Sequence, residues 1–356
     1  MGQAASIQIK TKKLIRLHTD SKKYAEAASL VYATDTAPGI TRKRRGKNFS
    51  YFFRHRRITE KKVLQRIKSL VIPPAWEEVW INLLPEGHLQ VTGLDARKRK
   101  QYKYHPQWQQ LRNETKFHRM IEFGKVLPAL REQLEKDLRS TEMTQEKVIA
   151  TVVKIMEQTA IRIGNDCYEK ENGSYGLTTL KNRHVKVNGS HIRFSFVGKK
   201  GISHSITLRS KRMARLVRQC MEIPGQELFQ YINGDGIPRV IDSGKVNAYI
   251  KAITEKDLTA KDFRTWIGSV IALRAFRNAG MAENPTAAKK KIIEVLDCVS
   301  KQLGNTRNVT KKYYVHPVLI SLYEDNKLEK YFKNPADGAE GLNDDEKILM
   351  KIIEKN

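Results

Sequence analysis

Residues 185–197 read Val185-Lys186-Val187-Asn188-Gly189-Ser190-His191-Ile192-Arg193-Phe194-Ser195-Phe196-Val197, and Gly198-Lys199-Lys200-Gly201 follows directly. Apolar and polar residues alternate on both sides of Asn188-Gly189, the dipeptide that is the strongest short signal for a tight hairpin turn. The run from Ile202 to Leu208 predicts a further strand after the glycine-flanked tip. We therefore expect a β insertion here, whose second tip presents two lysines to solvent.

The residues that flank this insertion have helical spacing. Apolar residues recur on one face between 117 and 138, and again from 148 to 156 in a helix expected to end near Gly164. Further towards the N-terminus, residues 49–53, 79–83 and 88–93 alternate as strands do, and a helix over 59–67 is stopped by Pro73-Pro74.

These patterns predict an α+β protein with three parts. Residues 1–115 form a small, β-rich N-terminal domain, and residues 116–335 form a larger, mainly α-helical domain that contains the β-hairpin insertion. Residues 336–356 are expected to be a C-terminal tail with a short amphipathic helix over 344–353.

Positive charge is the most informative bulk property of the chain. Its 356 residues include 66 Lys+Arg and 38 Asp+Glu, a net charge of +28, far above the magnitude of about 2 to 8 that solubility suggests. Residues 1–120 alone hold 26 Lys+Arg and 9 Asp+Glu, which gives +17 of that net charge. A polyanion is the expected partner, and the concentration of charge favours a separate domain that grips phosphates.

Membrane, secreted and metal-dependent classes do not fit the sequence. It has no run of about 18 apolar residues and no basic segment followed by an apolar one at its start. The three cysteines stand far apart without metal-ligand spacing, and HExxH, DxD-type and Walker A sequences are absent. We expect a cytoplasmic, nucleoid-associated protein that uses no metal and no small-molecule cofactor.

Cleavage of one strand of a nucleic-acid duplex without a metal needs four things. They are a nucleophile that attacks the phosphorus, hydrogen-bond donors around the developing negative charge, an acid that protonates the departing 5′ oxygen, and contacts that hold the duplex. Candidate residues for all four roles occur in a series of segments along the chain. They are Thr159-Ala160-Ile161-Arg162-Ile163-Gly164-Asn165 with Tyr175–His184, Phe196-Val197-Gly198-Lys199, Lys261-Asp262-Phe263-Arg264-Thr265-Trp266, Leu303-Gly304-Asn305-Thr306 with Lys311-Lys312-Tyr313-Tyr314-Val315-His316-Pro317, and, earlier, Val71–Trp76 with Gly93–Pro106.

In this order, from about residue 30 to 325, the segments resemble the motifs of type IB DNA topoisomerases of the poxvirus-like and bacterial branch. The resemblance implies a catalytic domain of the kind shared by tyrosine recombinases and type IB topoisomerases. It also implies relaxation of supercoiled duplex DNA through a 3′-phosphotyrosine intermediate, without ATP or metal, by a monomer that clamps around the DNA. Each segment alone is a weak match to this family, but the occurrence of all of them in the same order is specific for it.

The resemblance assigns two arginines to the scissile phosphate. Arg162 is expected to close a helix just before Gly164, and Arg264 to lie at the start of another helix. Two guanidiniums held on separate rigid elements can fork onto the non-bridging oxygens of one phosphate.

The resemblance selects Lys199 as the general acid, although its neighbour Lys200 could reach the same place from the hairpin tip. A lysine can donate its proton at neutral pH only if its pKa falls, which nearby cations could cause.

Of two adjacent tyrosines, the nine-residue step from Asn305 and the Tyr-x-His-Pro ending select Tyr314 as the nucleophile. A neutral phenol is a weak nucleophile, so the two arginines are expected to favour the phenolate. Asn305 stands where poxvirus-type proteins have a histidine, and its NH2 group can still donate a hydrogen bond. His316 is the alternative donor.

The resemblance also implies DNA contacts, from Lys100, Gln101, Tyr102, Tyr104, Arg97 and Lys261. A strand over 100–104 would place Tyr102 and Tyr104 on one face, where they could meet DNA or, alternatively, a protein core. The basic run 42–45 resembles a localisation tag or an arm, but it is expected to grip phosphates.

Two other functions remain open. A tyrosine recombinase shares the arginine, lysine and tyrosine set, but usually has histidine three residues before the second arginine, where this chain has Lys261. A non-catalytic DNA binder accounts for the charge but not for the ordered motifs.

Overall fold

The computed structural model describes residues 20–46, 48–96, 98–333 and 340–356. The chain divides into two compact units between His118 and Arg119, within helix α4 (Pro106–Asp137). The first unit is built on a six-stranded antiparallel sheet, and the second is mainly helical with a three-stranded sheet. This architecture confirms the predicted α+β class.

The first unit packs one helix against its sheet, whose strand order is β3-β2-β1-β4-β5-β6. Its elements before α4 are α2 (Ser21–Ala27), β1 (Ile40–Arg45), β2 (Asn48–Phe53), β3 (Arg56–Arg57), α3 (Lys61–Ser69), β4 (Glu77–Ile81), β5 (Leu89–Leu94) and β6 (Lys100–Tyr104). Ile67 of α3 is buried against Ile40, Val79 and Val91 of the sheet. Val79 and Val91 lie in the alternating segments that predicted strands, whereas β1 with Ile40 was not predicted.

The basic run at residues 42–45, which is expected to grip phosphates, lies in a strand of this sheet. These residues belong to β1, which pairs with β2 and places Arg42 opposite Tyr51. Arg42 Nη2 donates to the carbonyl oxygens of Pro73 (3.0 Å) and Trp76 (2.6 Å), and its guanidinium lies 4.2 Å from the centroid of the Phe49 ring. Arg42 is therefore used inside the unit, and only the following residues of the run are exposed.

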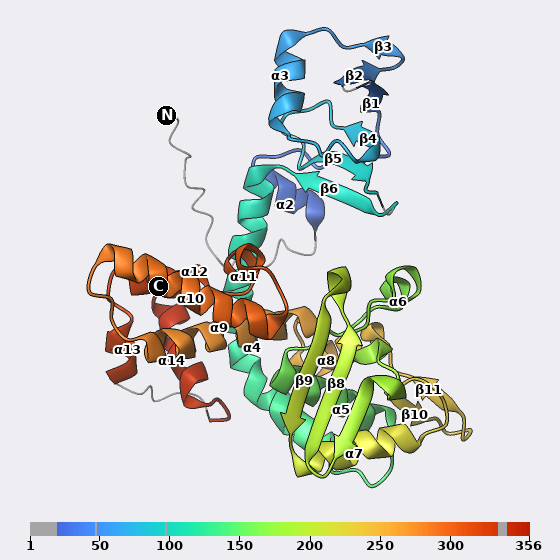
Figure 1. The fold of residues 1–356 in the computed structure, drawn as a ribbon, viewed down its shortest axis with the longest axis vertical. Coiled ribbons are helices and arrows are strands. Elements are labelled where there is room, and N and C mark those ends of the chain that lie inside the picture. Colours follow the sequence, from blue (N-terminus) through green and yellow to red (C-terminus); the bar gives the residue numbers. More distant parts are fainter. Residues whose placement is uncertain (1–19, 47, 97, 334–339) are drawn as a thin grey trace. The chain divides into compact units, whose positions relative to one another are not determined.

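The second unit contains the predicted β insertion. Its elements after α4 are α5 (Gln145–Thr159), α6 (Asp166–Asn172), the short 3₁₀ turns η1 (Leu177–Thr179), η2 (Asn182–His184) and η3 (Lys199–Gly201), strands β7 (Val185–Asn188), β8 (His191–Val197), β9 (Ser203–Arg209), β10 (Gln230–Ile232) and β11 (Pro238–Val240), and helices α7 (Lys211–Glu222), α8 (Ser243–Thr254), α9 (Ala260–Ala279), α10 (Pro285–Leu303), α11 (Arg307–Tyr313), α12 (Pro317–Glu324), α13 (Glu329–Lys333) and α14 (Asp344–Lys355). Strands β7, β8 and β9 pair in sequence, and α5 and α7 pack against them (Figure 1). The small β10–β11 hairpin was not predicted.

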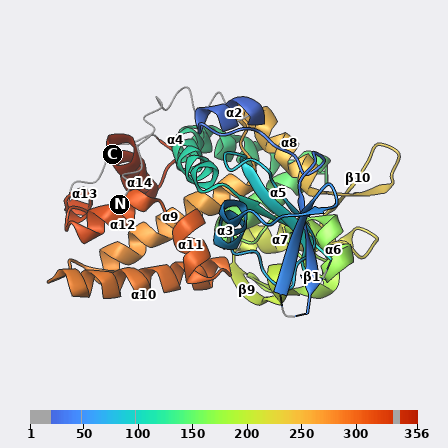
Figure 2. The same ribbon diagram turned by 90° about the horizontal axis from the view of Figure 1, so that it is seen from above.

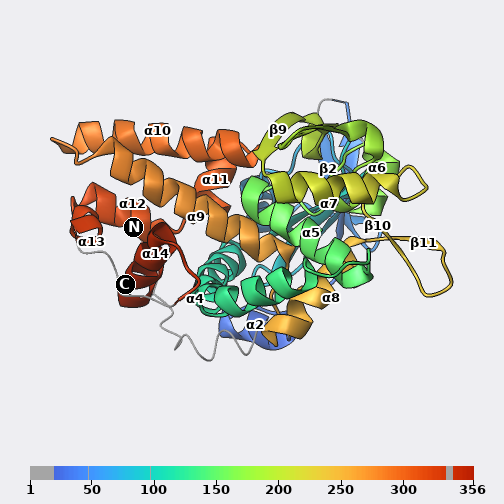
Figure 3. The same ribbon diagram turned by 90° about the horizontal axis from the view of Figure 1, so that it is seen from below.

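Helix α9 is the centre of the helical part. It lies beside α10, as both Figure 2 and Figure 3 show, and its buried Phe263 and Trp266 pack on Phe123 of α4 with ring centroids 4.9 and 5.7 Å apart. In the described part of the chain, no helix combines the length and the apolar character needed to cross a membrane.

Helix α14 packs into the second unit, although residues 336–356 were expected to be a separate tail. Its apolar face is buried against α9 and α12. Arg131 of α4 donates from Nη1 and Nη2 to the two carboxylate oxygens of Glu346, each at 2.8 Å, and Trp266 Nε1 donates to the same carboxylate at 3.1 Å. The sequence showed the amphipathic helix but not these distant partners.

Candidate active site

Arg162 lies in an extended segment after helix α5, and not at the end of the helix as the sequence suggested. Helix α5 ends at Thr159 because Ala160 takes a left-handed backbone conformation, with φ of 54°. Alanine rarely adopts this conformation, so the sequence contained no signal for the early stop. The turn directs the chain away from the helix axis and carries Arg162 towards the end of α10.

Backbone contacts with η1 hold the Arg162 segment in place. The N–H of Leu177 donates to the carbonyl of Arg162 at 2.8 Å, and the N–H of Thr178 donates to Ile163 at 2.7 Å. Gly176 allows this close approach, because a Cβ there would lie 2.6 Å from the carbonyl oxygen of Arg162. The motif Tyr175-Gly176-Leu177-Thr178 is thus needed to fix the position of the arginine.

Arg264 is held in the first turns of α9 and is 5% exposed. Its helix starts with a capping box, in which Thr259 N donates to Asp262 Oδ2 at 2.8 Å. Arg264 donates from Nη2 to the carbonyl of Leu303 at 2.8 Å and from Nη1 to the carbonyl of Ala160, while its Nε has no partner among the described residues. Burial, and then the Arg162 cation, lower its pKa.

Asn305 follows the C-terminal end of α10, where Gly304 has φ of 60° and stops the helix. Arg162 Nη2 donates to Asn305 Oδ1 and, at 3.3 Å, to the carbonyl of Gly304. The Nδ2 of Asn305 is buried and has no partner within the described chain. Because a buried donor without an acceptor costs about 1–3 kcal/mol, this NH2 group is suited to receive an oxygen of a ligand.

Tyr314 follows the last turn of α11, and its ring centroid lies 5.2 Å from Arg264 Cζ. Ser269 of α9 fixes its backbone: Ser269 Oγ donates to the Tyr314 carbonyl at 3.2 Å and accepts from His316 N at 3.0 Å. Gly268 makes room for this contact, because a Cβ there would lie 2.6 Å from the Tyr314 carbonyl oxygen. The same helix therefore carries Arg264 and anchors Tyr314.

Lys199 begins the turn η3 at the tip between β8 and β9. The residue as a whole is exposed, but partial burial of its ammonium and then the Arg162 cation lower its pKa, which Tyr314 opposes. Lys261, exposed on the first turn of α9, also lowers the pKa of Lys199. Four catalytic candidates, at positions 162, 199, 264 and 314, are therefore close enough to interact electrostatically.

The first unit carries the other predicted DNA contacts on β6. The rings of Tyr102 and Tyr104 stack with centroids 6.1 Å apart, as expected for one face of a strand, and Tyr102 is 48% exposed. Lys100 pairs with Asp35 at 2.5 Å. Gln101, beside them, has its amide held by a hydrogen bond to Asp95.

Two further expectations concern Arg97 and His316. Arg97 lies outside the described residues. His316 caps α12, where its Nδ1 accepts from Val318 N at 3.2 Å and Pro317 occupies the first turn, as predicted. This capping role occupies one ring nitrogen of His316 and favours Asn305 as the amide or imidazole donor of the site.

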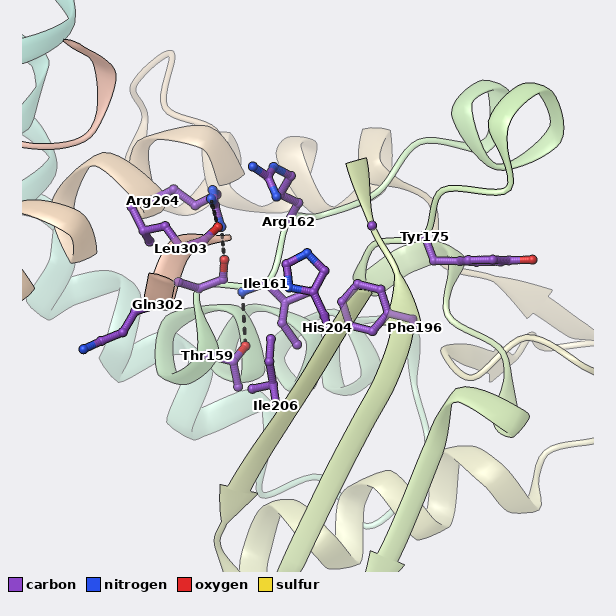
Figure 4. Close-up of a pocket in the computed structure, with 12 residues that line it drawn as sticks. Thr159, Ile161, Arg162, Tyr175, Phe196, His204, Ile206, Arg264, Gln302 and Leu303 are labelled. Carbon is purple, nitrogen blue, oxygen red and sulfur yellow. Dashed lines mark hydrogen bonds between the residues drawn. The ribbon is translucent and has the colours of Figure 1, made fainter. Parts of the chain in front are cut away.

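One residue of the site was missed in the sequence. His204 of β9 lines a cavity of about 10 Å³, room for about one water molecule, together with Arg162, Arg264 and Phe196 (Figure 4). The hairpin register pairs His204 with Phe196, three residues before Lys199, so counting across the predicted tip could have found it. Burial, then Arg162 and Arg264, lower the pKa of its imidazole.

Known proteins similar to this chain are type I topoisomerases. A family model described as the catalytic core of eukaryotic DNA topoisomerase I matches residues 105–336, and one described as the N-terminal domain of bacterial DNA topoisomerase IB matches residues 48–95. DNA topoisomerase 1B of Acanthamoeba polyphaga mimivirus is 31% identical over 298 residues, which cover 81% of this chain and 88% of that protein. DNA topoisomerase 1B of vaccinia virus (strain Copenhagen) is 24% identical over 272 residues, covering 74% and 82%. Because the first model alone spans more than half of the sequence, this chain belongs to the type IB DNA topoisomerase family.

Proposed function

We propose that this type IB DNA topoisomerase relaxes supercoiled duplex DNA by cutting one strand with Tyr314 and then resealing it. The observation that carries the proposal is the convergence of two guanidiniums and an unpartnered amide donor around one tyrosine. Tyr314 lies beside Arg264, Arg162 bonds Asn305, and the Nδ2 of Asn305 has no acceptor among the residues that the structure describes.

In the cleavage step, the phenolic oxygen of Tyr314 attacks the scissile phosphorus. The bond between phosphorus and the 5′ oxygen breaks, and that oxygen takes a proton from Lys199, while the phenolic proton goes to solvent. The products are a 3′-phosphotyrosine and a free 5′ hydroxyl. The lowered pKa of Lys199 supports the acid role, because it makes the ammonium a readier proton donor than a free lysine.

Three groups stabilise the negative charge that develops on the non-bridging oxygens. Arg162 and Arg264 offer guanidinium donors, and Asn305 offers Nδ2. The two guanidiniums bond backbone carbonyls, the Asn305 amide and the Tyr314 hydroxyl, so no carboxylate among those contacts competes with the phosphate for either guanidinium. Each preorganised donor of this kind contributes about 10²–10³ in rate.

Resealing is the reverse reaction, in which the 5′ hydroxyl attacks the phosphotyrosine. The covalent bond to Tyr314 retains the energy of the broken backbone, so the cycle needs neither ATP nor a metal. While the strand is open, rotation of the free end relaxes supercoils of either sign.

A monomer that clamps the duplex fits the basic first unit. Lys100, Gln101, Tyr102 and Tyr104 on β6, together with Arg97 in the first unit and Lys261 in the second, would contact DNA, with phosphate contacts setting position and base contacts adding preference. The match to a bacterial-type N-terminal domain supports a role at a nucleoid in the cytoplasm.

Relaxation of a supercoiled plasmid in EDTA without ATP tests the proposal. The wild type should relax it and form a covalent adduct whose labelled peptide contains Tyr314. Tyr314→Phe should lose both relaxation and adduct, and the matched control Tyr313→Phe should retain both. Retained relaxation by Tyr314→Phe would overturn the proposal. A requirement for paired sites would indicate a recombinase, and binding without relaxation a non-catalytic binder.

A further inference from the structure

The imidazole of His204 is wedged between two glycines that precede catalytic candidates. A Cβ on Gly198, next to Lys199, would lie 2.7 Å from His204 Cδ2 and Nε2. A Cβ on Gly304, next to Asn305, would lie 2.3 Å from His204 Cε1. The ring therefore touches the backbone of the hairpin tip on one side and that of the α10 end on the other.

The His204 ring stacks on an aromatic side chain and faces two cations. It stacks on Phe196, with centroids 5.1 Å apart and planes 23° apart. The charged groups that face it are Arg162 from the segment after α5 and Arg264 from α9, and the cavity that it shares with them has no carboxylate in its lining (Figure 4). His204 forms no hydrogen bond with the described residues, so its role is not explained by stabilising a partner.

We propose that His204 is a positioning residue that sets the hairpin tip bearing Lys199 against the segment bearing Asn305. The inference rests on the proposed function, because it assumes that Lys199 and Asn305 act on one phosphate. The ring itself does not touch the reacting atoms. It fixes the separation between two backbone segments that no hydrogen bond joins in the described part of the chain.

Removal of the His204 ring should misplace Lys199, and a misplacement of about 1 Å costs about 100-fold in rate. It should also let water reach the Lys199 ammonium, because the tip is no longer held in the site. The acid of the reaction would then titrate at higher pH, closer to an ordinary lysine.

Protonation of His204 should have its own effect. An imidazolium beside Arg162 and Arg264 adds a third cation where no carboxylate balances it, so the wedge should be disrupted as pH falls through the lowered pKa of His204. A phenylalanine keeps the aromatic ring but cannot take up a proton.

Single-turnover cleavage of a short duplex, measured against pH, tests the role. We expect His204→Ala to be about 10- to 100-fold slower, with the alkaline fall in rate moved to higher pH. In His204→Phe, the fall in rate at alkaline pH should match that of the wild type, and the fall in rate at acid pH should be absent. His191→Ala, at the exposed far end of the same sheet, is the matched control and should follow the wild type. Circular dichroism and thermal unfolding would check that each variant folds.

A double-mutant cycle adds a test of the contact itself. Gly198→Ala should slow cleavage in the wild type, where the new methyl group collides with the imidazole, and should do less harm in His204→Ala. Additive effects, or equal slowing of His204→Ala at every pH, would show a merely structural residue and overturn the inference. If the wild type forms no Tyr314 adduct at all, the proposed function itself fails, which is a distinct result.

Discussion

Asn305 combines two functions in one amide. Its Oδ1 accepts from Arg162 and so orients that guanidinium, while its buried Nδ2 has no acceptor in the described structure. The resemblance to poxvirus-type proteins implies a histidine at this place, and under the proposed function a neutral amide would suffice because its Nδ2 can donate a hydrogen bond.

Substitutions of Asn305 should therefore distinguish the effect of its hydrogen-bond donor from the effect of its side-chain shape. Asn305→Asp keeps the shape, but it replaces the donor with a negative charge next to the phosphate. We expect single-turnover cleavage to fall at least about 100-fold in Asn305→Asp and less in Asn305→His. Wild-type activity in Asn305→Asp would show that Nδ2 does not meet the phosphate.

A pH profile should report the acid role of Lys199. The lowered pKa means that the ammonium is lost at lower pH than in a free lysine, so cleavage should fall as pH rises through that value. Lys199→Arg, which holds its proton, should be about 10²- to 10⁴-fold slower. A substrate with sulfur in place of the departing 5′ oxygen should restore the cleavage rate of Lys199→Arg, because a thiolate leaves without being protonated. Lys200→Arg is the control, and failure of the sulfur substrate would contradict acid catalysis.

At the scale of elements, helix α9 carries Arg264 and also holds the backbone of Tyr314, the candidate nucleophile. Gly268→Ala would place a methyl group 2.6 Å from the Tyr314 carbonyl, so the start of α12 or α9 itself must shift. We expect a loss of about 1–3 kcal/mol in the free energy of unfolding and a marked fall in adduct formation. Gly234→Ala, in a turn with no atom near the added Cβ, should change neither. Chemical denaturation and adduct yield would measure the two effects.

Helix α14 supports α9 through Glu346. Burial alone would raise the pKa of this carboxyl, but hydrogen bonds from Arg131 and from Asn343 N–H outweigh it, so the pKa is lowered. The stability it contributes is present above its unfolded pKa and is lost as pH falls through the folded one.

Glu346→Gln should lower the free energy of unfolding by about 2 kcal/mol at neutral pH, and the difference should shrink in acid below about pH 4. Glu354→Gln, which removes an exposed partner of Lys125, should change stability by less than about 0.5 kcal/mol. A difference between Glu346→Gln and wild type that stays constant with pH would contradict the ion-pair explanation.

Local patterns predicted some elements well and others not at all. Asn188-Gly189 located the β7–β8 turn, and Pro317 located the start of α12, because both signals act within a few residues. The stop of α5 at Ala160 depends on a backbone conformation that alanine rarely takes, and the packing of α14 depends on Arg131, which is far away in the sequence. The candidate residues could be read from motifs, whereas His204 required the register of the folded hairpin.

For the whole molecule, charge sets the response to salt. Many carboxylates are paired within the protein, such as Asp35 with Lys100 and Asp262 with Arg119, and the net charge remains +28. Affinity for duplex DNA should fall steeply with salt, with a log–log slope of about −0.9 per neutralised phosphate. Titrations at several salt concentrations would measure it. Lys261→Ala should make the slope shallower by about 1, and a flat response would contradict duplex binding.

The dependence of α9 on α14 also bears on how the enzyme is made. Helix α14 follows Tyr314 along the chain, yet it braces the helix that carries Arg264. Because translation runs from the N-terminus to the C-terminus, the Tyr314 segment leaves the ribosome before α14 can pack on α9. We therefore expect the candidate site to assemble only after α14 has emerged as well.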